Sequence, residues 1–173
     1  NKASDGATIF LPHWLLSYEE MESLLLDRTD SNAPNQSRML FDTIIDVKKT
    51  TLERLGKSDV LNNFTVESPV PYNLEDVISK IEEEDTKMVP GSGGREKQGP
   101  LYGKLTRFVQ RLKSKQEDKR LNFLFSSDTE LLDYDYLPNL IRNILGFGDD
   151  KGIKIIDFSE VPSDILPLIT GLI

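Results

Sequence analysis

The residues most suggestive of chemistry lie near the end of the chain, where the apolar run Ile153–Phe158 carries Asp157. A carboxylate at the end of a strand often holds magnesium in ATPases, and a glutamate that orients the attacking water usually follows it. Here Phe158 follows instead. We therefore favour a simpler interpretation, in which Asp157, Ser159 and Ser163 cap the helix that comes next.

A nucleotide site also needs a phosphate loop, which combines glycines for a tight turn with a lysine and a serine or threonine. In the segment Gly99–Thr106, Gly103 and Lys104 are adjacent, but Leu105 occupies the position of the hydroxyl residue. The glycines of Gly91–Gly94 have no lysine directly after them and no apolar strand before them. The sequence therefore contains no phosphate loop, and its glycines are better explained as residues that shape the start of a helix.

Other catalytic chemistry has little support in the composition. The chain has no cysteine and one histidine, His13, at a Pro-Trp corner. Disulfides, cysteine nucleophiles and thiolate metal sites are thereby excluded, and we expect His13 to have a packing role. No pair of acids has a spacing that indicates glycoside hydrolysis.

A basic segment is the clearest candidate for ligand binding. The chain has a net charge of −8, yet Leu101–Arg120 holds seven lysines and arginines against two acids, a net +5. On a helix, four of these cations fall within an arc of roughly 80°; they are Lys104, Arg107, Arg111 and Lys115. Such a stripe suits a nucleic-acid backbone, but one that faces the acidic helices of the same fold would have the same sequence. Both interpretations stay open.

Three strands and a series of helices are expected to position these residues. The predicted strands are Thr8–Leu11, Leu121–Phe125 and Ile153–Phe158. Apolar spacing and capping residues predict six helices: one after the cap Ser17, then Gln36–Leu55, Asn73–Glu84, Leu101–Lys115, Tyr136–Leu145 and one from Pro162 onward. Thr86–Pro100 is rich in glycine and polar residues, which predicts a flexible loop. The final residues are apolar and helical, so we expect the chain to be part of a longer protein.

Three stretches resemble the HerA-like ATPases, DNA-translocating relatives of FtsK and of the type IV secretion ATPases. The first stretch begins with "IFLPHWLLSYEEMESLLL", the second is "GPLYGKLTRFVQRLKSKQEDKRLNFLF", and the third begins with "IKIIDFSEVPSDILPLI". In the last stretch Asp164 replaces the glutamate usual in that family. The resemblance spans nearly the whole chain and is weakest from Thr86 to Gln98.

The resemblance implies an α/β fold: part of a RecA-like parallel-sheet P-loop ATPase core with an all-α helical insertion subdomain. Residues 1–13 would form a core strand region, 14–118 the helical insertion, and 119–173 the return to the core. In the family the phosphate loop lies upstream, and the metal-linked acid and catalytic glutamate lie downstream. Asp157 would then lie near the nucleotide core without being its principal acid.

The function implied is an ATP-driven DNA translocase or helicase that uses ATP and Mg²⁺ and assembles as a cytoplasmic homo-hexamer. Its partners would be double-stranded DNA and a NurA-like nuclease or a defence effector subunit, in DNA end processing or antiphage defence. Arg120 and Arg142 are candidates for an arginine that acts on a neighbouring subunit's nucleotide. This segment alone is expected to be inactive. The alternative is a non-enzymatic helical module that docks a partner protein.

Overall fold

A computed structural model describes residues 9–145 and 155–172 of the chain. These residues are mostly helical, and their only sheet is a two-stranded antiparallel hairpin. The α-helices are α1 (Tyr18–Leu25), α2 (Ala33–Arg54), α3 (Ser58–Leu61), α4 (Leu74–Thr86), α5 (Thr106–Glu117), α6 (Asn122–Phe125), α7 (Tyr136–Leu145) and α8 (Leu166–Leu172). The strands are β1 (Met88–Pro90) and β2 (Glu96–Gln98), and short 3₁₀ turns are η1 (His13–Leu15), η2 (Ser92–Gly94), η3 (Lys119–Leu121) and η4 (Thr129–Leu132).

The predicted helices that begin with a capping residue are confirmed. The Ser17 hydroxyl accepts a hydrogen bond from the Glu20 amide, and the Glu20 carboxylate accepts one from the Ser17 amide at 2.8 Å. At α4 the Asn73 side-chain oxygen is the cap, and it accepts a single hydrogen bond from the Glu75 amide at 3.1 Å. Helix α2 ends just before Gly56, whose φ of +64° is the left-handed conformation that glycine adopts readily.

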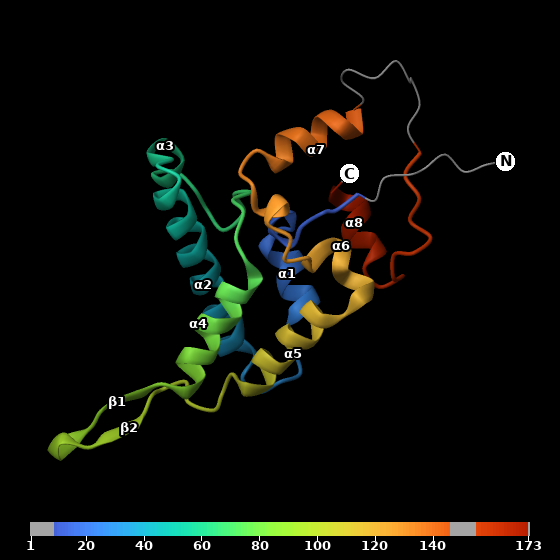
Figure 1. Cartoon of the computed structure of the whole chain (residues 1–173). Coiled ribbons are helices and arrows are strands. Elements are labelled where there is room, and N and C mark those ends of the chain that lie inside the picture. Colours follow the sequence, from blue (N-terminus) through green and yellow to red (C-terminus); the bar gives the residue numbers. More distant parts are fainter. Residues whose placement is uncertain (1–8, 146–154, 173) are drawn as a thin grey trace.

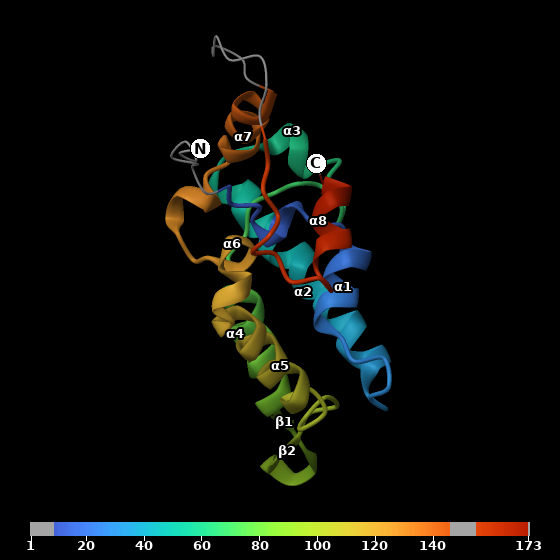
Figure 2. The same cartoon turned by 90° about the vertical axis from the view of Figure 1, so that its right-hand side faces the viewer.

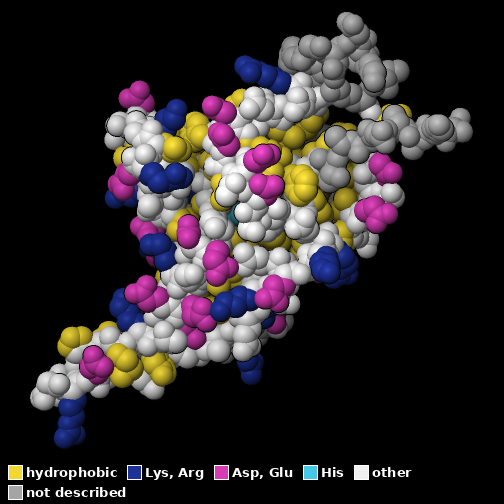
Figure 3. Space-filling model, in the orientation of Figure 1, with side chains coloured by type: hydrophobic (Ala, Val, Ile, Leu, Met, Phe, Trp, Pro, Cys, Tyr) yellow, Lys and Arg dark blue, Asp and Glu magenta, His cyan; other side chains and the backbone are white. Residues whose placement is uncertain are grey.

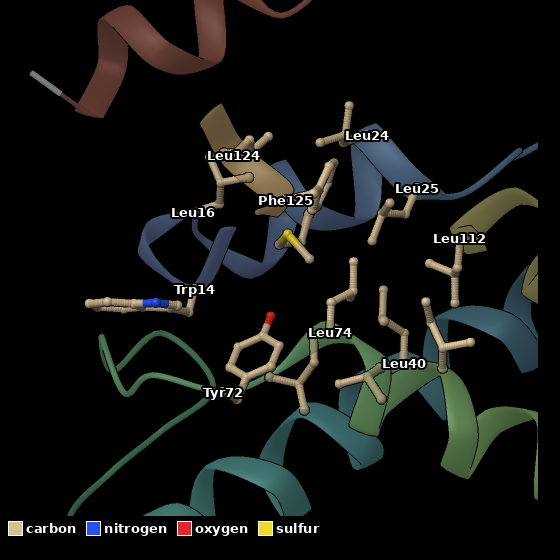
Figure 4. Close-up of a cluster of buried hydrophobic side chains, with 14 of the residues drawn as sticks. Trp14, Leu16, Leu24, Leu25, Leu40, Tyr72, Leu74, Leu112, Leu124 and Phe125 are labelled. Atoms are coloured by element: carbon tan, nitrogen blue, oxygen red, sulfur yellow. The ribbon is translucent and has the colours of Figure 1, made fainter. Parts of the chain in front are cut away.

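The helices pack around one hydrophobic core. Helix α2 lies against α4, α4 against α5, and α5 against α1 and α6 (Figures 1 and 2). Aromatic and leucine side chains from these helices and from the loops between them meet at the centre (Figure 4). The fully or nearly fully buried members include Trp14, Leu25, Leu40, Tyr72 and Phe125.

The prediction of a strand over Leu121–Phe125 is wrong, because η3 and α6 occupy these residues. Leu121, Leu124 and Phe125 are buried, whereas Asn122 is exposed. This burial follows the i, i+3, i+4 spacing of a helix. A short apolar run fits a buried helix and a buried strand equally well, so only the surrounding core selected between them.

The other two predicted strands are also wrong where the structure describes them. Thr8 lies outside the described residues, and Ile9–Leu11 belongs to no sheet, although the Leu11 amide donates to the Phe123 carbonyl at 3.0 Å. Ile153 and Lys154 lie outside the described residues, and Ile155–Phe158 forms no strand. A strand requires a neighbouring strand, and the turn of α6 removes the expected neighbour. No parallel sheet is present among the described residues.

The predicted flexible loop Thr86–Pro100 contains the β1–β2 hairpin, which is a further correction. Met88 pairs with Gln98, Val89 with Lys97 and Pro90 with Glu96. The Gly91 amide donates to the Arg95 carbonyl at 2.7 Å and the Gly99 amide to the Lys87 carbonyl at 2.9 Å. Glycine-rich composition indicated a loop, but the same glycines permit the close approach of the two strands.

Two helices begin later than predicted. Helix α5 starts at Thr106 instead of Leu101, since Gly103 has a φ of +71° that interrupts helical geometry. Helix α8 starts at Leu166 instead of Pro162, after a turn in which the Ile165 amide bonds to the Pro162 carbonyl. Helix α7 is confirmed, and its predicted stop at Gly146 lies outside the described residues.

Candidate nucleic-acid interface

Helix α5 carries most of the predicted basic stripe, and a residue of α4 fixes its first turn. The carboxylate of Asp85 accepts hydrogen bonds from the Leu105 amide at 2.7 Å and from the Thr106 hydroxyl at 2.6 Å. The Asp85 carbonyl also accepts one from the Gly103 amide at 2.9 Å. These bonds satisfy groups that a helix N-terminus leaves without partners. Sequence reasoning missed Asp85, although an acid in the last turn of a helix is unfavourable there and signals another role.

The buried face of α5 determines where its cations point. Phe108, Val109 and Leu112 are buried in the core. Arg107 is consequently exposed, and Arg111 and Lys115 are partly buried at the border of the core face. Lys104 is exposed in the turn before the helix. The structure therefore places three of the four predicted cations on α5 and the fourth just ahead of it.

Arg111 is engaged by acids of the loop between α1 and α2. Its guanidinium lies 3.4 Å from the Asp27 carboxylate, and its Nη1 is buried without a hydrogen-bond partner. The nearby Asp30 has a lowered pKa, first because the Asn32 amide donates to it and further because Arg107 and Arg111 are close. This part of the stripe faces acids of the chain itself. Binding of nucleic acid by the four cations stays a prediction.

The two candidate trans-acting arginines lie in different settings. The Arg120 guanidinium donates to both carboxylate oxygens of Asp118, at 3.1 and 2.6 Å, and lowers the Asp118 pKa to about 2. Its side chain is nevertheless 74% exposed. Arg142 lies on the exposed polar side of α7, and the described residues give it no ion pair.

Asp157 is exposed in the segment before α8. Its carboxylate accepts a hydrogen bond from the Ser159 amide at 2.9 Å, and this bond lowers its pKa. The bond closes a turn that lies well before α8, so the prediction that Asp157 caps the helix is corrected to a turn-closing role. Its proximity to a nucleotide core stays a prediction.

The residues that the structure describes do not build a site for ATP and magnesium. No group of histidine, aspartate or glutamate side chains within 9–145 and 155–172 has the geometry of a metal site. An open depression of about 510 Å³ lies between α2 and α4, with Arg54, Asp76 and Lys80 among its lining residues. Lys80 is already paired with Asp46 at 2.5 Å. No phosphate loop adjoins this depression, so we derive no nucleotide chemistry from it.

The family model described as "Helicase HerA, central domain" matches residues 1–173, the whole chain. No curated protein matches the sequence. Among the helices that the structure describes, none combines the length and apolar character that crossing a membrane requires.

Proposed function

From the premise that the chain belongs to the family of HerA helicase central domains, we propose that it is a segment of an ATP-driven, ring-forming DNA translocase. The match over residues 1–173 carries this proposal, and it confirms the resemblance found in the sequence. The family consists of nucleotide-dependent ATPases and helicases, so the parent protein is an enzyme of that general kind.

We also propose that the parent protein contains a RecA-like parallel sheet. Ile155 is 89% exposed, which is unusual for a residue of an apolar run. We propose that the segment around Ile155 pairs with strands of the parent protein that this chain does not supply. ATP and Mg²⁺ would be held by the nucleotide motifs that the resemblance places upstream and downstream.

DNA is the proposed substrate of the motor, and a homo-hexameric ring its proposed assembly. Lys104 and Arg107 support a role in DNA contact because both are exposed and neither forms an ion pair among the described residues. Figure 3 shows lysines and arginines interspersed with acids over one face of the body. A nuclease or defence effector would use the DNA that the motor moves.

ATP hydrolysis by the full-length protein tests the proposal. We expect hydrolysis to be stimulated by double-stranded DNA and the stimulation to weaken with salt. In a Lys104→Gln, Arg107→Gln variant, more DNA should be needed for half-maximal stimulation, while hydrolysis without DNA stays unchanged. A full-length protein that hydrolyses no ATP with or without DNA would overturn the proposal.

A docking module is the second candidate function, and one observation favours it. Helix α7 has an apolar side from which Ile141 and Leu145 are 46% and 64% exposed. A partner subunit that covers this side would bury both residues. An Ile141→Asp variant of the full-length protein should then lose its partner while DNA-stimulated hydrolysis continues. Association unchanged by Ile141→Asp would remove this candidate.

A further inference from the structure

The β1–β2 hairpin extends away from the helical body. It leaves the end of α4 and returns to the start of α5, and both views show it projecting beyond these helices (Figures 1 and 2). Most of its side chains are exposed, including every residue of β2. Because a two-stranded ribbon on its own buries few apolar groups, the core does not explain why this element is present.

The two faces of the hairpin differ in charge. Side chains alternate between faces along a strand, so Arg95 and Lys97 share one face and Glu96 lies on the other. Across from Arg95 and Lys97 stand Gly91 and Val89, in agreement with the register. Lys87, opposite Gly99, continues the same face and bonds to Glu84 of α4. This cationic face of the hairpin, formed by Lys87, Arg95 and Lys97, contains no acid of its own.

The cationic face of the hairpin is not covered by side chains of the opposite strand, because glycines lie across from Arg95 and Lys87. A Cβ atom added at Gly91 would lie 2.7 Å from the Arg95 carbonyl oxygen, and one at Gly99 would lie 2.9 Å from the Lys87 carbonyl oxygen. Both glycines are thus required by the close strand pairing. Arg95 and Lys97 make no ion pair among the described residues, whereas Lys80, Lys113 and other cations of the body are paired with acids.

We propose that the cationic face of the hairpin contacts the phosphate backbone of duplex DNA. The proposal rests on the translocase function and names a second contact for the same substrate. A two-stranded ribbon fits the major groove, which is about 12 Å wide, and residues two apart on a strand are spaced by about 6.8 Å. The chain as a whole is acidic at −8, and a basic element that projects from the body can approach a polyanion without bringing the acidic surface close to it.

An acidic surface on a second copy of the chain is the competing ligand. Protein interfaces draw most of their binding energy from buried aromatic and large apolar anchors. The cationic face of the hairpin offers only Val89 in that class, and the exposed Met88 is on the opposite face. Charge with little apolar area is typical of phosphate contact, so we favour DNA.

Salt-dependent binding of a short mixed-sequence DNA duplex to the full-length protein tests the proposal. Neutralising two phosphate contacts in an Arg95→Gln, Lys97→Gln variant should reduce the slope of log K against log salt by about 2. The matched control is Lys49→Gln, Arg54→Gln. It removes the same charge near the C-terminal end of α2, beside α3 and remote from the hairpin (Figure 1). The control should keep the wild-type slope, and Arg95→Lys, Lys97→Arg should keep it too.

The other possible outcomes would each contradict the proposed contact between the hairpin and DNA. A wild-type slope in the Gln double variant would overturn the hairpin contact, and the translocase proposal would stand if wild-type protein still binds DNA. Loss of ring assembly with an unchanged slope would overturn it in favour of a contact between copies. Equal slope changes in the hairpin and control variants would show general electrostatics and would also overturn it. Absence of DNA binding by the wild-type protein would remove both proposals.

Discussion

The carboxylate of Asp85 holds the backbone amide of Leu105 at a distance of 2.7 Å, although twenty residues separate the two in sequence. Asp85 is in the last turn of α4 and only 7% exposed. A negative charge is unfavourable at the end of its own helix and favourable at the start of α5. This contact joins the end of α4 to the start of α5, on either side of the hairpin between them.

Replacing Asp85 with alanine should lower the free energy of unfolding by about 1–3 kcal/mol, because the Leu105 amide and the Thr106 hydroxyl lose their acceptor. Asp85→Asn should lose less, since its amide oxygen still accepts one bond. Urea denaturation measures the difference. The exposed neighbour in Glu83→Ala is the control and should stay within about 0.5 kcal/mol of the wild type. Equal stability of the Asp85 and Glu83 variants would contradict the capping role.

His13 should make the free energy of unfolding of the chain decrease in acid. Its ring lies between Tyr72 and Phe125, with centroids at 4.8 and 5.8 Å. Burial lowers its pKa from 6.5 to about 4, and the backbones of Leu124 and Tyr72 oppose the shift only partly. Neither ring nitrogen makes a hydrogen bond of ordinary geometry.

The direction of the pH effect follows from proton binding. Between pH 6.5 and 4 the unfolded chain binds a proton at His13 and the folded chain does not, so stability falls as the pH falls. The full loss from this residue is about 3 kcal/mol. His13→Phe should remove that part of the slope in urea unfolding measured from pH 7 to 4.5. Parallel pH curves for wild type and variant would show that His13 is not responsible.

The ion pair between Asp27 and Arg111 should lower the affinity for DNA, if the basic stripe on α5 contacts DNA as proposed. Asp27→Asn removes the charge 3.4 Å from the Arg111 guanidinium. A charge near the binding surface in water is worth a fraction of a kcal/mol, so affinity should rise about two- to threefold at low salt and little at high salt. Fluorescence anisotropy with labelled duplex measures this. Asp59→Asn in α3 is the control; an equal gain there would indicate a general charge effect.

Replacing the two candidate arginines should lower ATP hydrolysis by the full-length protein to different extents. An arginine that completes a neighbour's nucleotide site contributes roughly 10³–10⁵ in turnover. Arg142→Ala or Arg120→Ala should cause such a loss while the ring stays assembled. The bond to Asp118 already occupies Arg120, whereas the described residues give Arg142 no ion pair, so we expect the larger loss at Arg142. Retained turnover excludes the residue that was changed.

Local signals predicted part of the fold well. The capping box at Ser17, the cap at Asn73 and the glycine stop at Gly56 each depend on residues within a few positions, and all three are observed. The start of α5 was missed because the left-handed backbone of Gly103 and the bonds from Asp85, a residue of another helix, set it together. The hairpin was missed because its glycines resemble those of an open loop until the pairing of the strands is seen.

The sequence by itself determined the main helices and the family. The spacing of apolar residues, the capping residues and the order of the motifs can all be seen in the linear sequence. Only the tertiary structure decided that Leu121–Phe125 is helical and that Arg111 faces Asp27. A five-residue segment with four apolar side chains fits either a helix or a strand, and the packing partners select between them. Arg111 and Asp27 are 84 positions apart, so their pairing depends on how α5 packs against α1 and not on any local pattern.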